Sequence, residues 1–259
     1  NSAPRQRSLE LDEATFQQSK RLFFEALQGD KQLTRREMFA LLNQANISTA
    51  GQRGYYLLWR NAQEGSICFG PMRDKQQTFV LLDEWAPNAK RMERDQALAE
   101  LANRYFSSRG PATLQDFVWW SGLKVADARA GLEAIASQLR SKKIDDQTYW
   151  MPPDRESLPS ISPQAHLLPG FDEYLLAYKD RSAMLETQHS QIISPGGGMF
   201  RSTIVLNGRV FGAWRRVIKK GGVSIALQPF GTPDEAENRA LFKAASDYGE
   251  FLGMPVSLS

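Results

Sequence analysis

The residues of this sequence best suited to chemistry are arginines and aromatic side chains that could grip a polyanion. A helix predicted to begin at Ser48 or Thr49 and to end before Gly65 carries Gln52, Arg53, Tyr56 and Arg60. The last three recur at i, i+3 and i+7, which predicts one outward-facing stripe. A basic and aromatic stripe suits contacts with phosphates and a DNA groove, and a solvated helix face without a partner is the alternative.

Further cations lie in two other parts of the chain. Arg73 and Lys75 fall in residues 70–77, between two predicted strands, where they could touch a DNA backbone. No acidic residue occurs between Glu186 and Asp234, and such one-sign stretches attract phosphate. The cations of that stretch are Arg201, Arg209, Arg215, Arg216, Lys219 and Lys220.

Lys179 and Arg181 complete the candidate DNA-binding residues, and they lie among carboxylates. One of these acids could act as a base in base excision, or the group could be a structural ion-pair network. The acids are Asp172, Glu173, Asp180 and Glu186.

No other pattern in the chain indicates catalysis. His166 and His189 are the only histidines and have no Cys or His partner at metal-ligand spacing, so no metal site is predicted. The glycine-rich residues 195–200 lack the Lys-Ser/Thr of a P-loop. Met199 and Phe200 there could act as a minor-groove wedge, although a loop with a buried anchor is the favoured interpretation.

Composition restricts the class of protein. The chain has 259 residues, a net charge of +3 and one cysteine, Cys68, which cannot form an internal disulfide. These values predict two or three globular domains in a reducing cytoplasm. No apolar run is long enough to cross a bilayer, so no membrane partner is expected.

A repeated unit organises the elements that must position these residues. The first copy opens at Thr34 with Glu37 three residues later, and the second opens at Thr113 with Asp116. Thr-x-x-acid is a helix-capping pattern. Each copy continues through two short helical stretches and closes on a short aromatic strand, at residues 78–80 and 147–150. This order is the plan of a winged helix, and two in tandem point first to duplex DNA.

The predicted fold class is therefore α+β, with tandem winged-helix units followed by a small antiparallel β-barrel-like domain with a C-terminal helix. Residues 1–90 and 91–153 form the two winged helices. The proline-rich residues 154–165 are the linker, and residues 166–259 form the barrel-like domain. Asn207-Gly208 predicts a hairpin turn within it. The second copy lacks a convincing DNA-reading helix, and its Trp119 and Trp120 are expected in packing contacts.

Three segments resemble one known family, the bacterial winged-helix DNA-binding proteins of the AlkZ/YcaQ type. They are Arg109-Gly110-Pro111-Ala112-Thr113-Leu114-Gln115-Asp116-Phe117 with Trp119-Trp120; His166-Leu167-Leu168-Pro169-Gly170-Phe171-Asp172-Glu173-Tyr174 with Tyr178-Lys179-Asp180-Arg181; and Asn207-Gly208-Arg209-Val210 with Gly212, Trp214 and Arg215. The resemblance implies a DNA glycosylase that removes alkylated bases or unhooks interstrand crosslinks. It also implies a hairpin within residues 187–216 that probes the minor groove.

The resemblance further implies that the catalytic Gln-x-Gln or Gln-x-Asp motif belongs to a first winged helix upstream of this sequence. No catalytic residue is therefore assigned, and no metal or cofactor is expected. The expected partner is double-stranded DNA, bound by a monomer. A winged-helix transcriptional regulator and a protein-interaction module remain the alternatives, because fold alone does not choose among them.

Overall fold

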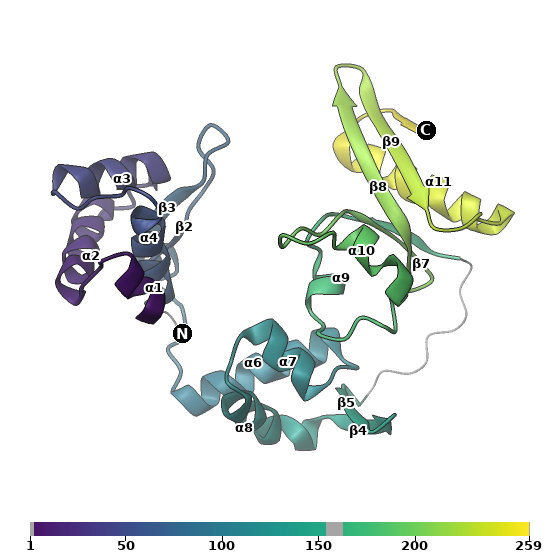
Figure 1. The fold of residues 1–259 in the computed structure, drawn as a ribbon, viewed down its shortest axis with the longest axis horizontal. Helices are drawn as coiled ribbons and strands as arrows, with labels where there is room; N and C mark the ends of the chain where they lie inside the picture. Colours follow the sequence, from purple (N-terminus) through teal and green to yellow (C-terminus); the bar gives the residue numbers. More distant parts are fainter. Residues whose placement is uncertain (1–2, 154–162, 259) are drawn as a thin grey trace. The chain divides into compact units, whose positions relative to one another are not determined.

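The computed structural model describes residues 3–153 and 163–258 of the chain (Figure 1). Contacts between residues divide the chain into an N-terminal unit, Asn1–Arg91, and a C-terminal unit, Met92–Ser259. Most of the expected linker, residues 154–162, lies outside the described residues. Among the described residues, no helix has the length and apolar character needed to span a membrane.

The N-terminal unit consists of helices around a small antiparallel sheet of order β1-β3-β2. Its elements are α1 (Ala3–Ser8), α2 (Glu13–Leu27), β1 (Leu33–Thr34), α3 (Arg35–Gln44), α4 (Arg53–Gln63), β2 (Ile67–Phe69), β3 (Thr78–Leu81) and α5 (Leu82–Trp85). Phe16, Phe23 and Leu27 line the buried face of α2 and pack with Met38 and Leu57.

Helix α4 begins later than the sequence predicted. The Asn43 side chain accepts a hydrogen bond from Thr49 N at 3.2 Å and donates one to Thr49 Oγ1 at 3.0 Å, which ties the loop after α3. Gly51 follows with φ of 61°, a left-handed conformation that interrupts a helix. The backbone therefore becomes helical at Arg53 instead of at Ser48 or Thr49.

The C-terminal unit begins with a second set of helices and a hairpin. These elements are α6 (Arg94–Arg109), α7 (Leu114–Ser121), α8 (Val125–Ile135), η1 (Ala136–Gln138), β4 (Arg140–Ile144) and β5 (Gln147–Met151). An isolated β-bridge joins Ala112 to Trp150, as Leu33 pairs with Phe79 in the N-terminal unit. Both copies of the repeat therefore have the same order of elements. Strand β4 was not predicted, because all five of its residues are exposed and show no apolar alternation.

The rest of the C-terminal unit is a five-stranded sheet with a long helix. Its elements are β6 (Ala165–Leu168), α9 (Glu173–Leu176), η2 (Thr187–His189), α10 (Ser190–Ile193), β7 (Thr203–Leu206), β8 (Arg209–Lys219), β9 (Gly222–Pro229), α11 (Glu235–Leu252) and β10 (Val256–Leu258). The predicted turn at Asn207-Gly208 joins β7 to β8, with φ values of 50° and 78°.

The expectation of a barrel-like domain is not met, because the sheet is open. Its strand order is β10-β9-β8-β7-β6, and β6 and β10 remain edge strands in the described part of the chain. Strand β10 pairs parallel to β9, so the sheet is also mixed. Leu241 and Ala245 of α11 pack on Trp214 and Ile225. Because a helix already covers that apolar face, the sheet needs no closure to bury it.

Asp116 joins the second set of helices to the chain that leads into the sheet. Only 3% of this residue is exposed. Its Oδ2 accepts hydrogen bonds from Thr113 N at 2.9 Å and Thr113 Oγ1 at 2.7 Å, which completes a capping box. Its Oδ1 accepts from Lys179 N at 2.9 Å and Asp180 N at 3.4 Å. One side chain therefore caps α7 and holds a loop more than sixty residues away.

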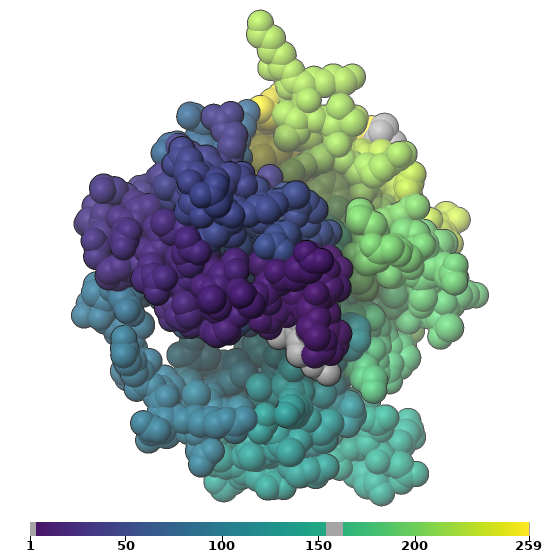
Figure 2. Space-filling view, turned by 60° about the vertical axis from the view of Figure 1, so that its left-hand side comes forward, coloured from purple at the N-terminus to yellow at the C-terminus, as the bar shows by residue number. Residues whose placement is uncertain are grey.

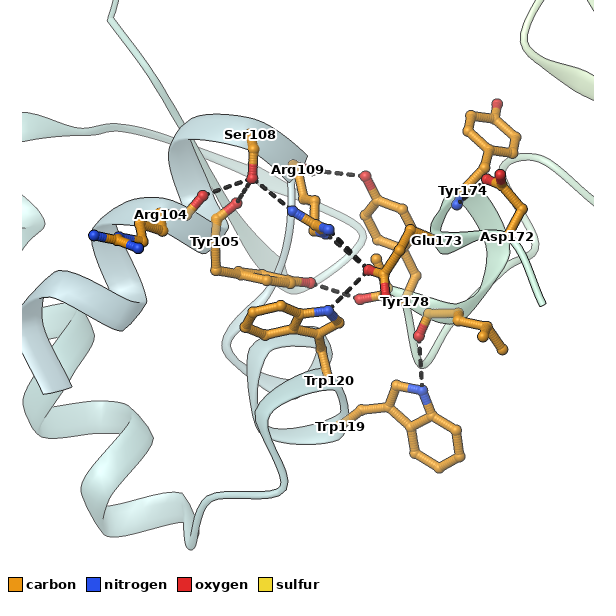
Figure 3. A network of polar contacts seen from close by, with 12 residues as sticks. Arg104, Tyr105, Ser108, Arg109, Trp119, Trp120, Asp172, Glu173, Tyr174 and Tyr178 are labelled. Carbon is orange, nitrogen blue, oxygen red and sulfur yellow. Dashed lines mark hydrogen bonds and ion pairs between the residues drawn. The ribbon is translucent and has the colours of Figure 1, made fainter. Parts of the chain in front are cut away.

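Glu173 and two tryptophans extend this junction (Figure 3). Glu173 Oε2 accepts from Arg109 Nη2 at 2.8 Å and from Trp120 Nε1 at 2.9 Å. Trp119 Nε1 donates to Leu176 O, and Tyr105 donates to Ala177 O from a fully buried position. Trp120 packs against the cluster that includes Tyr105 and Phe117, as the sequence predicted, whereas Trp119 is 54% exposed and belongs to no hydrophobic cluster of the described residues.

Replacing Asp116 with alanine is expected to destabilise the C-terminal unit by about 3 kcal/mol, because it leaves several buried N–H groups without an acceptor. The matched control is Glu37→Ala, which removes the same capping-box position in the N-terminal unit. Glu37 is partly exposed, and within the described ranges its backbone partner lies in its own cap, so the loss of its side chain should cost about 1 kcal/mol.

Urea unfolding measures the stability difference, and hydrogen exchange at the Lys179 and Asp180 amides localises it. Asp116→Asn, which keeps an acceptor at the same position, should show an intermediate loss. Equal losses for Asp116→Ala and Glu37→Ala would contradict the assigned role of the long-range hydrogen bonds.

Candidate nucleic-acid interface

The prediction that Arg53, Tyr56 and Arg60 form an outward-facing stripe on α4 is wrong at Tyr56. Tyr56 is buried, with 9% of its surface exposed, and it packs in the core of the N-terminal unit. Arg53 is half-buried, and its guanidinium donates to the carbonyls of Leu9, Glu10 and Ser48. The stripe therefore faces the segment before α2 and the core, because α4 packs there instead of standing clear of the unit.

Arg60 is also held by side chains of its own unit. It lies 2.8 Å from Glu13 and 3.3 Å from Glu64, and its guanidinium carbon is 3.7 Å from the centre of the Phe16 ring. These carboxylates raise the pKa of Arg60, although burial acts in the opposite direction and is the largest single influence. Two carboxylates thus already neutralise much of the charge that a phosphate would use.

The exposed face of α4 carries aromatic residues that the spacing argument missed. Tyr55 is 49% exposed and Trp59 is 48% exposed, and Gln52 lies on the exposed surface near the start of the helix. The Arg35 guanidinium lies 5.1 Å from the centre of the Tyr55 ring. Moving the assumed exposed face of α4 by one residue would have identified Tyr55 and Trp59. Periodicity alone, however, does not show which face of a helix packs against the core.

Among the residues that the structure describes, the hairpin between β2 and β3 presents one cation without a partner, Lys75, and one tethered cation, Arg73. Asp74 and Lys75 form its turn with positive φ values, and Lys75 is exposed. Arg73 forms an ion pair with Glu37, the capping residue of α3. Hydrogen bonds from Thr34, followed by the contact with Arg73, lower the pKa of Glu37. Lys75 is therefore the freer of the two predicted contacts.

The hairpin of β8 and β9 carries the most concentrated exposed charge of the candidate set. Strand β8 pairs with β7 only as far as Ala213 but with β9 as far as Lys219, so residues 214–219 extend beyond β7 (Figure 1). In Figure 2 the end of this hairpin, yellow-green at the top, stands out from the neighbouring atoms of its unit. Arg215 and Arg216 are both exposed.

The two faces of this hairpin differ. Side chains alternate along a strand, so Arg215, Val217 and Lys219 share one face. The other face turns toward α11, where Arg216 lies 5.4 Å from the centre of the Tyr248 ring. On the first face the cross-strand partners are small, namely Ala226, Ser224 and Gly222. We call Arg215, Val217 and Lys219 the free face of the hairpin, since only small side chains oppose them.

The glycine-rich loop before β7 has both an anchor and an exposed tip. Gly196, Gly197 and Gly198 all adopt positive φ, which glycine accepts without steric cost. Phe200 is half-buried and packs with the hydrophobic cluster around Leu175, whereas Met199 is 56% exposed. The buried-anchor interpretation holds for Phe200. Nearby candidates Arg201 and Arg209 are both exposed.

Lys179 and Arg181 occupy contrasting environments. The Lys179 side chain is exposed, while its backbone N–H is held by Asp116. Arg181 is half-buried, and its Nε donates to Leu175 O at 2.6 Å. Its guanidinium carbon lies 5.3 Å from the Phe200 ring and 5.7 Å from the Trp119 ring. Desolvation lowers the pKa of Arg181, and the field of Asp116 opposes that shift.

The acids near Lys179 and Arg181 have structural partners. Asp172 accepts from Tyr174 N at the start of α9, Glu173 pairs with Arg109, and Glu186 lies beside Gln188 and His189. Asp180 accepts from Ser182 N at 2.9 Å, and this bond lowers the pKa of its carboxyl. The contacts favour the structural interpretation over a catalytic base. In the described residues, no group of three or more His, Cys, Asp or Glu residues could hold a metal ion.

The chain is similar to known DNA glycosylases in both sequence and fold. A family model described as "DNA glycosylase AlkZ-like" matches residues 1–251. An interstrand DNA cross-link repair glycosylase of Streptomyces sahachiroi is 27% identical over 208 residues, which cover 76% of this chain and 54% of that protein. The solved structure of the Streptomyces sahachiroi DNA glycosylase AlkZ matches with a TM-score of 0.77 and 22% identity, covering 98% of this chain and 72% of that chain.

The α+β arrangement is thus the fold of a structurally characterised DNA glycosylase. The chain belongs to the AlkZ-like DNA glycosylase family, as its sequence motifs predicted. It spans about half the length of the curated relative that it matches.

Arg60→Gln is expected to destabilise the N-terminal unit by about 1 kcal/mol, because it removes two ion pairs and a cation–π contact. Urea unfolding measures this loss, with Lys75→Gln on the exposed turn as a control that should be neutral. A change in the salt dependence of duplex binding without loss of stability would instead assign Arg60 to DNA contact.

Proposed function

We propose that this chain binds double-stranded DNA and forms the gripping part of a glycosylase that acts on alkylated or crosslinked bases. The observation that carries the proposal is the free face of the β8–β9 hairpin, where two cations flank an exposed Val217. Cations at this spacing suit the phosphates beside a groove, and an apolar side chain between them suits an unstacked base step.

Two winged helices provide the rest of the proposed DNA-binding body. The N-terminal unit supports this assignment through its sheet order β1-β3-β2 and its helix-helix-hairpin succession. Helices α6 to α8 with β4 and β5 follow the same succession in the C-terminal unit. In the first of them, Lys75 of the hairpin is exposed, whereas the side chain of Gln52, just before α4, already accepts a hydrogen bond from Arg5 Nη2 at 2.8 Å.

The remaining candidate residues differ in how readily they could contact DNA. Arg201, Arg209 and Arg216 would add phosphate contacts around the hairpin, since all three are exposed. Arg53, Arg60 and Arg73 would contact DNA only by giving up contacts inside their own unit. Tyr56 would act through the core that shapes α4.

The proposed reaction of the whole protein is hydrolysis of an N-glycosidic bond. The curated relative is named an interstrand DNA cross-link repair glycosylase, which supports this class of substrate. No catalytic residue of this chain is proposed. Its contribution is to hold and deform the duplex so that a damaged base leaves the stack.

Arg215→Ala with Lys219→Ala is expected to weaken duplex binding and to reduce the slope of log K against log salt by about two, one for each lost phosphate contact. Fluorescence anisotropy across a salt series measures this slope. The matched control is Arg239→Ala with Lys243→Ala, which removes the same charge from exposed ion pairs on α11. Equal effects of the two double variants would mean that net charge acts, and not the hairpin.

The same assay with two matched duplexes tests the repair function. A duplex carrying an abasic-site analogue should bind more tightly than an intact one, because its backbone is easier to deform. A transcriptional regulator would instead prefer one sequence and bind as a symmetric dimer. A protein-interaction module would show no salt-dependent duplex affinity, and that result would overturn the proposal.

A further inference from the structure

A small polar cup opens between the loop after α9 and the start of η2, inside the C-terminal unit. Its volume is about 250 Å³. The side chains that line it supply two cations, several hydroxyl groups and a single carboxylate. They include Lys179, Asp180, Arg181, Ser182, Thr187 and Ser190. The volume exceeds that of several water molecules, so a phosphate group fits with water around it.

Arg181 gives this cup an incompletely compensated positive charge. Its Nε is used by the Leu175 carbonyl, and its buried Nη2 has no hydrogen-bond partner among the described residues. In that same part of the chain no carboxylate lies within ion-pair distance of it, and the acid whose field reaches it is Asp116. A buried cation without a partner is costly, so an anion in the cup would stabilise it.

The carboxylate of Asp180 offsets only one of the two positive charges that line the cup. The Asp180 carboxylate already accepts a hydrogen bond from Ser182 N, which closes a local turn at residues 180–182. Lys179 adds a second cation whose side chain is exposed. The side chains that line the cup therefore carry two positive charges and one negative charge. Hydroxyl donors such as Thr187 and Ser182 complement the oxygens of a phosphate group more directly than they would suit a cation.

The position of the cup is fixed by contacts already described. Asp116 holds the backbone N–H groups of Lys179 and Asp180, and Phe200 lies against the Arg181 guanidinium. A site built on anchored backbone loses little conformational freedom when a ligand binds. The anchored backbone of Lys179 and Asp180 thus distinguishes the cup from the exposed cations of the β8–β9 hairpin.

We infer that this cup is a binding site for a single phosphate group. Two sources share this chemistry, namely a backbone phosphodiester of the bound duplex and free phosphate. The duplex source rests on the proposed function, whereas the cup itself does not. A phosphodiester seated there would fix the register of the DNA on the C-terminal unit.

The test uses the full chain and two exposed positions of the cup. Thr187→Asp places a carboxylate in it, and Thr187→Asn is the isosteric neutral control. Lys179→Gln removes the exposed cation, and Lys243→Gln on α11 is its charge-matched control. Thermal melting verifies that all four variants are folded, which is expected because both cup positions have exposed side chains.

In the first arm, inorganic phosphate is titrated while the NMR signal of the Arg181 Nε–Hε group is followed. We expect a saturable shift in the wild-type protein and in Thr187→Asn, and its loss in Thr187→Asp. Absence of a saturable shift in the wild-type protein would overturn the inference.

In the second arm, duplex binding is measured across a salt series. Lys179→Gln should reduce the slope of log K against log salt by about 0.9, and Thr187→Asp should weaken binding several-fold more than Thr187→Asn. A phosphate shift with unchanged duplex binding would support the cup and overturn the duplex as its source. If the wild-type protein binds no duplex at any salt concentration, the proposed function fails, and the phosphate arm still decides the cup.

Discussion

The buried carboxylate of Asp116 is the interaction on which the C-terminal unit depends. Its two oxygens accept hydrogen bonds from the cap of α7 and from the backbone of Lys179 and Asp180. A carboxylate with 3% exposure is tolerable only when such donors surround it. These hydrogen bonds therefore hold helices α6 to α8 against the loop that leads into the sheet. Arg181, next in that loop, lies beside Phe200, and both residues line the polar cup.

The two copies of the repeat use the same cap for different purposes. In the N-terminal unit Glu37 closes the box on Thr34 and then pairs with Arg73 of the neighbouring hairpin. In the C-terminal unit the shorter side chain of Asp116 turns inward and binds backbone amides instead. In the N-terminal copy the cap of α3 thus holds the β2–β3 hairpin. In the C-terminal copy the cap of α7 holds the loop at Lys179 and Asp180. The repeat preserves local folding while its outer contacts diverge.

Charge and exposure separate the candidate DNA contacts into those that are occupied and those that are free. Arg53, Arg60 and Arg73 carry positive charge that acceptors of the same unit already engage. Arg215 and Lys219 stand on a hairpin face opposed by small side chains. Since ion pairs within a protein compete with phosphate for the same guanidinium, the second group is the stronger basis for binding DNA.

The sequence by itself determined the local structure: both Thr-capped helices, the Asn207-Gly208 turn, the C-terminal helix and the family. These features depend on residues within a few positions of one another, where capping and turn chemistry decide the conformation. Only the tertiary structure decided that Tyr56 is buried, that the sheet stays open, and that Asp116 reaches Lys179. Helical spacing tells which side chains share a face, but what covers that face depends on packing against distant segments. Sheet closure likewise depends on pairing between edge strands far apart in the chain, for which no local signal exists.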